Sequence, residues 1–189
     1  LNINFIICPK FNFKIKIISM KKFALILTII MSLAVSKNAI AQGTIVDVAV
    51  GNKDFSTLVT ALKAADLVGA LQGEGPFTVF APTNDAFAKI ESNTLASLLE
   101  VKNQKALANI LTYHVISGKI VATDVVSALE KGNGTVKLKA LNGQVLTVVQ
   151  KDGKILLKDL NDNYSEIVAT DVMGSNGVIH VIDTVVMPN

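Results

Sequence analysis

The sequence lacks arginine and tryptophan altogether, and its 189 residues include a single cysteine. That cysteine, Cys8, stands close to the start of the chain, so a domain formed by the later residues has no thiol. Disulfide bonds, thiol catalysis and cysteine-based metal sites are therefore excluded from such a domain. The absence of arginine also argues against a nucleic-acid-binding protein, because arginine is the side chain most used to contact phosphates and guanines.

The amino-terminal part of the chain has the order of a secretory signal peptide. Met20-Lys21-Lys22 is a basic start, Phe23–Val35 is an apolar run of thirteen residues, and a more polar segment ends in Ala39-Ile40-Ala41. This order predicts a signal peptide over residues 20–41, with cleavage before Gln42. Thirteen apolar residues are fewer than the roughly 20 that cross a bilayer, so we expect no integral membrane span after cleavage.

Residues 1–19 precede a natural Met start, and we interpret them as an over-extended start rather than as structure. The formal net charge of +3 belongs to the leader, because residues 1–41 hold six of the eighteen lysines and none of the fifteen acidic residues. Residues 42–189 therefore carry twelve lysines against fifteen acids. No cysteine stands at the cleavage site for lipid attachment, so we expect a periplasmic or secreted, cell-surface protein. Its mildly acidic domain is unsuited to nucleic acid.

The most specific stretch of the chain is 75–90, GPFTVFAPTNDAFAKI. Phe77–Phe80 has the β-branched and aromatic residues of a short strand, and Pro82, which has no N–H, should stop its hydrogen-bond ladder. Thr83 is then expected as a helix N-cap, with Asp85 in the first turn near the positive end of the helix dipole. Phe87 and Ile90, three residues apart, would hold this short helix against a core.

In the rest of the chain, outside residues 75–90, apolar spacing predicts helices first and strands afterwards. Helical spacing covers residues 44–50, 55–65, 95–99, 106–111 and 123–129, with a polar gap at Lys102–Lys105. Asp54 or Ser56 is expected to cap the second helix, and Thr123 or Asp124 the last. From Thr135 the period becomes two, and Asn142-Gly143 and Asp152-Gly153 predict hairpins with type I′ turns. The expected strands are 135–140, 144–150, 154–158, 165–172, 178–182 and 184–187, and lysines should solvate one face of the first three. This order predicts an α+β fold with a mostly antiparallel sheet in a single domain, residues 42–189.

Three short motifs resemble those of the fasciclin domain family, in the same order. They are TVFAPTNDAF at residues 78–87, LTYHV at 111–115 and NGVIHVIDTVVMP at 176–188. The resemblance implies a wedge of mostly antiparallel strands with a helical bundle packed on it, in which the outer two motifs supply neighbouring strands. Thr184–Met187 should then lie beside Phe77–Phe80. The signature residues with an expected structural role are Phe80, Ala81, Pro82, Thr83, Asp85, Phe87, Gly177, His180, Val181 and Ile182.

The resemblance also implies partner-binding residues. Animal members of the family use a Tyr-His motif and an Asp-Ile motif as integrin-recognition elements, and the matching positions here are Tyr113-His114 and Asp171-Val172. This sequence has Ala169-Thr170 where the family has Glu-Pro, so the match is not specific for integrin. The alternatives are core packing for Tyr113, with its hydroxyl satisfied, and a turn or cap for Asp171.

His114 and His180 are the only histidines, and they define the catalytic alternative. A metal site needs three or four convergent ligands, and the sequence has no paired-histidine metal motif, so we expect no metal and no cofactor. The interpretation we favour is two neutral, partly buried histidines that hold loops by hydrogen bonds. An acid–base pair such as His180 with Asp183 is the alternative, although no GxSxG nucleophile motif or phosphate-binding P-loop is present.

The sequence therefore favours a non-catalytic, exported binding or adhesion module, acting as a monomer on a protein or polysaccharide of the cell surface or matrix. Two alternatives stay open: a periplasmic small-ligand-binding protein, which would need an apolar cavity, and a hydrolase that uses His114 or His180. Asn133-Gly134-Thr135 and Asn163-Tyr164-Ser165 are glycosylation sequons, which matter only in a eukaryotic secretory pathway.

Overall fold

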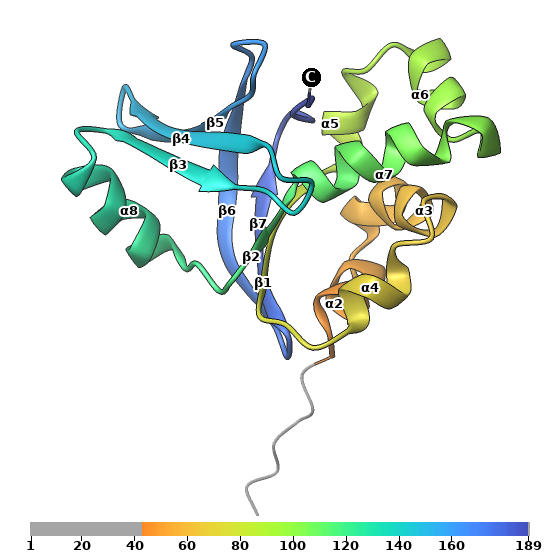
Figure 1. Cartoon of the computed structure of the whole chain (residues 1–189), viewed down its shortest axis with the longest axis horizontal. Helices are drawn as coiled ribbons and strands as arrows, with labels where there is room; N and C mark the ends of the chain where they lie inside the picture. Colours follow the sequence, from red (N-terminus) through yellow and green to blue (C-terminus); the bar gives the residue numbers. More distant parts are fainter. Residues whose placement is uncertain (1–42, 189) are drawn as a thin grey trace, which may run out of the picture. The chain divides into compact units, whose positions relative to one another are not determined.

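The computed structural model describes residues 43–188 (Figure 1). The predicted start, signal peptide and cleavage site lie outside the described residues. The helical elements are α2 (Ile45–Gly51), η1 (Lys53–Phe55), α3 (Ser56–Ala64), α4 (Val68–Gln72), α5 (Asn84–Ala88), α6 (Ser92–Leu98), η2 (Val101–Asn103), α7 (Gln104–Tyr113) and α8 (Ala122–Lys131). The strands are β1 (Phe77–Pro82), β2 (Val115–Ser117), β3 (Thr135–Lys139), β4 (Val145–Lys151), β5 (Lys154–Lys158), β6 (Tyr164–Gly174) and β7 (Gly177–Ile182).

The strands form one sheet of seven, in the order β2-β1-β7-β6-β5-β4-β3. Only β1 and β7 run parallel, and the other described pairs are antiparallel, so the α+β prediction with a mostly antiparallel sheet is confirmed. Strand β6 pairs with β5 near its start and with β7 along the rest, where the register shifts twice. Such bulges bend a strand, and in Figure 1 β3, β4 and β5 turn away from β1, β2 and β7.

The central strands β1 and β7 are buried on both faces, because one face of the two strands packs on one apolar cluster and the opposite face packs on another. Val79, Ala81 and Ile179 point to the cluster formed with helices α2 to α7. Phe80 and Ile182, at alternate positions, point to a second cluster with β4, β5 and α8. Side chains of a strand alternate between the two faces of a sheet, so the two strands join both clusters. Figure 1 shows α8 beside β3, on the side away from the other helices.

The hairpin signals behave differently in the structure. Asp152 and Gly153 both have positive φ, 52° and 75°, and they form the two-residue type I′ turn that was predicted between β4 and β5. At Asn142-Gly143 only Gly143 has positive φ, and Lys139 pairs with Val145 across a longer loop. The type I′ prediction is therefore wrong there: the Gly143 N–H donates to the Ala140 carbonyl, so Leu141 and Asn142 are the central residues of the turn, and neither has the positive φ that type I′ requires.

The predicted strand at Thr184–Met187 is wrong. That segment forms no strand, and its place beside Phe77–Phe80 is taken by β7, whose Gly177–Ile182 pairs in parallel with all six residues of β1. Apolar β-branched residues are present in the segment, but the backbone N–H groups of Val186 and Met187 bond to side chains instead. The prediction that the two outer motifs supply neighbouring strands is confirmed.

Three predicted boundaries also need correction. Pro82 does not stop the ladder before it; it is the last residue of β1 and lies opposite Ile182. Neither Asp54 nor Ser56 caps α3, whose N-cap is Phe55 with no side-chain hydrogen bond, and Asn52 caps the preceding η1. Helix α8 begins after Val121, so neither Thr123 nor Asp124 is its N-cap. Asp124 lies in the first turn, and its carboxylate accepts from the N–H of Val121. The N-cap prediction for Thr83 is confirmed, since its Oγ1 accepts from the Ala86 N–H.

Candidate functional site

His114 lies at the junction between helix α7 and strand β2. The apolar face of α7 packs inward through Leu107 and Leu111, which brings its last turn into the core. The His114 side chain is only 2% exposed. Its Nδ1 is 2.8 Å from the carbonyl oxygen of Ile110, and its Nε2 is 3.3 Å from the backbone nitrogen of Val186. The ring therefore links α7 to the carboxyl-terminal segment.

These contacts define the protonation of His114. Only Nδ1 can donate to the Ile110 carbonyl, so the neutral Nδ1–H tautomer leaves Nε2 free to accept from the Val186 N–H. Burial lowers the pKa of His114 to about 4, although its hydrogen bond to Ile110 opposes part of that change. A second proton would place a charge in an apolar site and remove the bond from Val186. The ring is therefore neutral at pH 7.

The neighbouring Tyr113 is fully buried, at 0% exposure. Its ring packs in the second apolar cluster with Phe80 and Leu146. Its hydroxyl donates to the carbonyl oxygen of Val145 over 3.0 Å, which satisfies the polar end of the side chain. Burial, followed by the negative charge of Asp159, raises the pKa of Tyr113 to about 12. In this structure neither side chain of the Tyr113-His114 motif reaches the surface.

His180 and Asp171 hold the loop that leads into helix α8. His180 is 1% exposed, with its Nε2 2.8 Å from the carbonyl oxygen of Ile120 and its Nδ1 accepting from the Asp171 N–H over 3.4 Å. Asp171 lies in the irregular part of β6 with a φ of 59°, and its carboxylate accepts from the N–H of Ala122, the first residue of α8. A negative charge at that position stabilises a helix N-terminus. Asp171 and Val172 are both partly exposed.

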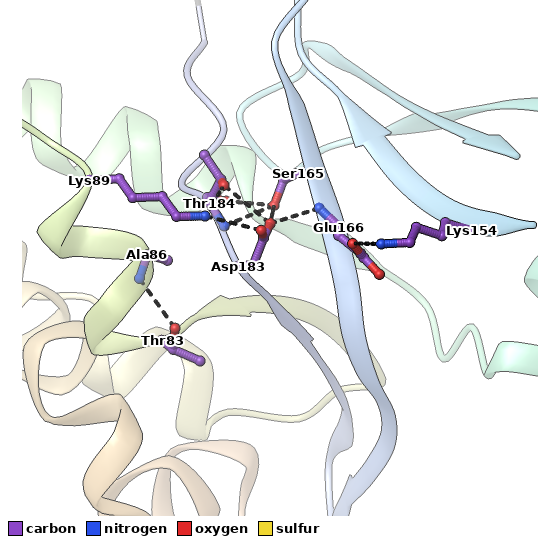
Figure 2. Close-up of polar contacts among 8 residues, drawn as sticks. All are labelled: Thr83, Ala86, Lys89, Lys154, Ser165, Glu166, Asp183 and Thr184. Carbon is purple, nitrogen blue, oxygen red and sulfur yellow. Dashed lines mark hydrogen bonds and ion pairs between the residues drawn. The ribbon is translucent and has the colours of Figure 1, made fainter. Parts of the chain in front are cut away.

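The predicted pair of His180 and Asp183 is not formed. Figure 2 shows Asp183 between Lys89, which follows α5, and Glu166 of β6. Its carboxylate lies 3.0 Å from Lys89 Nζ and accepts from the Glu166 N–H over 2.8 Å. Burial would raise the pKa of Asp183, but hydrogen bonds from Lys89, Glu166 and Thr184 outweigh it and hold that pKa below its ordinary value of 3.8.

The Ser165 hydroxyl completes this network. It donates to the carbonyl oxygen of Thr184 over 2.7 Å and accepts from the Thr184 N–H over 3.1 Å. Figure 2 also shows Thr83 capping the turn that carries Ala86. The network therefore fixes the end of β7 to β6 and α5. The carboxylate of Asp183 bonds to Lys89, Glu166 and Thr184, and these bonds hold the backbone in place instead of orienting a histidine base.

The remaining signature residues have packing roles. Phe80 and Ile182 enter the second apolar cluster, and Phe87 enters the first. Ala81 and Val181 lie opposite each other in β1 and β7. Asp85 occupies the first turn of α5 as predicted, and Pro82 ends β1. Gly177 lies opposite Phe77, and a Cβ at Gly177 would stand 2.3 Å from the Phe77 carbonyl oxygen, so these strands require a glycine there.

The core of the described domain contains two small apolar cavities. Their volumes are ≈ 20 Å³ and ≈ 10 Å³. Drug-sized ligands occupy pockets of roughly 300–1,000 Å³. Within residues 43–188, no three His, Cys, Asp or Glu side chains converge as metal ligands. None of the helices in that range is long and apolar enough to cross a bilayer.

A feature that residue-by-residue prediction missed is an open groove of ≈ 560 Å³ on the outer side of β3, β4 and β5. The alternation of Lys137 and Lys139 with Val136 and Leu138 predicted a solvated, lysine-bearing face, and this is confirmed. The groove itself depends on Tyr164 of β6 and on the turn after β5, which only the strand order brings to that face.

Comparison with known proteins decides the family. A family model described as "Fasciclin domain" matches residues 53–188. The chain belongs to the fasciclin domain family. The match spans the three motifs that carried the resemblance, and it includes β1, β7 and the Tyr113-His114 junction between them.

Bacterial and animal proteins with this fasciclin domain share much of its sequence. It is 52% identical over 145 residues to Protein sll1483 of Synechocystis, with 77% of this chain and 73% of that protein covered. Cell surface glycolipoprotein MPB83 of Mycobacterium bovis is 36% identical, over 78% of this chain and 62% of its own. Pig transforming growth factor-beta-induced protein ig-h3 is 40% identical over 78% of this chain, which is 20% of that larger protein.

A solved structure confirms the fasciclin fold. The FAS1 domain pair of the insect cell adhesion molecule fasciclin I superposes with a TM-score of 0.66 at 21% sequence identity, covering 75% of this chain and 50% of that one. The predicted architecture, strands with helices packed on them, is therefore the one observed.

Proposed function

We propose that this fasciclin domain is an exported binding module that adheres to a protein or polysaccharide at the cell surface and performs no catalysis. The observation that carries the proposal is the family match over residues 53–188. A relative named as a cell surface glycolipoprotein shares 36% of its residues over most of this chain, which supports a location outside the cytoplasm.

The geometry of the two histidines also favours binding over hydrolysis. A general base must lie within hydrogen-bond reach of a substrate, whereas both rings of this domain are buried and engaged by backbone groups. Core cavities of ≈ 20 Å³ and ≈ 10 Å³ give no support to a small-ligand carrier.

Within this proposal, the contact segment lies on β6 around Asp171 and Val172. Val168, three residues before Asp171, is 55% exposed, and Ala169 and Thr170 are exposed beside it. A partner would therefore meet accessible side chains leading up to the Asp171-Val172 motif. Tyr113 and His114 act in this proposal by fixing the strands behind the surface, because their own side chains are buried.

Beads coated with the purified full chain test the proposal. They should adhere to cells of the organism that encodes the protein, and uncoated beads should not. Val168→Lys should weaken adhesion about fivefold, the effect of roughly 1 kcal/mol at an interface residue. Val101→Lys is the matched control, because Val101 is 89% exposed on η2. Equal adhesion of coated and uncoated beads would contradict the proposed function, whereas equal loss in both variants would contradict the contact segment alone.

A further inference from the structure

The outer face of strands β3 to β5 presents a cluster of lysines. The inward positions Leu146, Val148 and Leu157 are fully buried in the second apolar cluster. Alternate residues must then point outward. The cross-strand pairs place lysines at these outward positions on all three strands: Lys137, Lys139, Lys151, Lys154 and Lys158. We name these five side chains the lysine face.

The lysine face differs in charge from the rest of the domain. Residues 42–189 hold twelve lysines and fifteen acids. The face carries five of those lysines, and its outward positions and bordering turns carry four acids, Asp152, Asp159, Asp162 and Glu166. Seven lysines and eleven acids remain elsewhere. A single positive face on an acidic domain orients an anionic partner toward that face.

Part of the lysine face has no acidic partner. Lys154 pairs with Glu166 over 2.7 Å, and Lys158 pairs with Asp162 over 2.7 Å. Among residues 43–188, Lys137, Lys139 and Lys151 form no ion pair, and all three are exposed. Their charges are therefore available to a ligand.

The groove on this face also contains an aromatic residue and uncharged polar residues that could contact a ligand. Tyr164, a residue that is 45% exposed, lines it, and Lys151 Nζ lies 5.7 Å from the centre of the Tyr164 ring. Thr135, Thr147 and Gln150, whose side chains carry hydroxyl and amide groups, line the same ≈ 560 Å³ groove. An aromatic ring packs on the C–H face of a sugar, while hydroxyls and amides exchange hydrogen bonds with sugar hydroxyls.

We propose that the lysine face binds a linear acidic polysaccharide whose sugars carry carboxylates. This inference rests on the proposed adhesive function and names its partner class. Carboxylates match the separate ammonium charges of lysine, and the sugar rings match Tyr164 and the polar groups of the groove. A phosphate polymer fits less well, because bidentate phosphate recognition is characteristic of arginine and the sequence has none.

The test measures binding of the purified full chain to polygalacturonate, a linear polymer of carboxylated sugars. Methyl-esterified polygalacturonate is the matched ligand control, because it keeps the sugar chain and loses the charges. Lys137→Gln, Lys139→Gln and Lys151→Gln are combined in the face variant. Lys53→Gln, Lys63→Gln and Lys105→Gln form a control variant with the same change in charge, since these lysines are exposed on the helical side. The lysines of residues 1–41 are common to all forms and cancel in the comparison.

An exposed charge contact contributes about a factor of two to three in affinity, so the face variant should bind polygalacturonate roughly tenfold more weakly. The control variant should stay within about twofold of the unchanged chain, and binding should weaken as salt rises. Tyr164→Ala, which leaves all charges in place, should weaken binding of the polymer as well.

Equal weakening in both variants, or undiminished binding of the esterified polymer, would overturn the assignment. Binding of single-stranded DNA or phosphatidylserine vesicles through these lysines, without binding of polygalacturonate, would overturn the ligand class in favour of phosphates. Absence of polygalacturonate binding while coated beads still adhere to cells would overturn this inference and leave the proposed function standing. Loss of bead adhesion is the separate outcome that contradicts the function itself.

Discussion

The stability of the domain should depend on pH through His114. The pKa of this histidine is about 4 in the folded protein, against 6.5 for an ordinary histidine. Below pH 6.5 His114 is protonated in the unfolded chain but stays neutral in the folded chain, so the free energy of unfolding falls as pH falls. The difference between these two pKa values corresponds to roughly 3 kcal/mol. That stability is fully present above pH 6.5 and is lost between pH 6.5 and about 4.

Urea unfolding measured between pH 4 and 8 checks this expectation, with His114→Gln as the control. The variant is less stable throughout, because it loses the shape of the ring, but it has no group at position 114 that titrates in this range. Subtracting the two curves therefore isolates the His114 contribution. Asp183 contributes little to the change in stability between pH 6.5 and 4. Its pKa lies below 3.8 in the folded protein, so the stability that it contributes is lost only as pH falls further.

The difference between the two curves should change by about 3 kcal/mol across the window, with its steepest slope near 1.4 kcal/mol per pH unit. Parallel curves would refute the reasoning, because they would mean that the folded protein accepts a proton on His114 as easily as the unfolded chain. NMR titration of the ring gives an independent check, and a folded-state pKa near 6.5 would contradict the buried, doubly bonded geometry.

Three further predictions concern stability measured by urea unfolding at pH 7. Thr83→Ala should lose about 1 kcal/mol with the N-cap bond to Ala86, whereas Thr83→Ser should keep most of it; partner binding should be unchanged, and lost binding in the folded variant would contradict a purely structural role. Tyr113→Phe should cost about 1 kcal/mol, because the Val145 carbonyl loses its donor; no loss would mean that water replaces the hydroxyl. Gly177→Ala should cost about 2–3 kcal/mol or more, since its Cβ meets the Phe77 carbonyl, whereas Gly69→Ala, with open space around it, should be neutral or stabilising.

Much of the local structure follows from neighbouring residues alone. The β-branched run before Pro82 gives a strand, the threonine after it gives a helix cap, and Asp152-Gly153 gives a type I′ turn, since each depends on φ preferences and bonds within a few positions. The same local rules gave a strand for Thr184–Met187, where they were wrong. That segment has strand-forming residues, but the ladder position beside β1 is already taken by β7.

The sequence by itself determined the class of fold and the family, because both depend on the order of apolar periods and on three short motifs. Tertiary structure decided which candidate residues are accessible to a partner and which are buried. Tyr113 and His114 have the chemistry of binding or catalysis, but the fold buries both side chains, Tyr113 in the second apolar cluster and His114 between α7 and the carboxyl-terminal segment, so their polar atoms bond to the backbone. The lysine face arises in the opposite way: lysines distant in sequence gather on one surface because β3, β4 and β5 pair in a register that turns Leu146, Val148 and Leu157 inward.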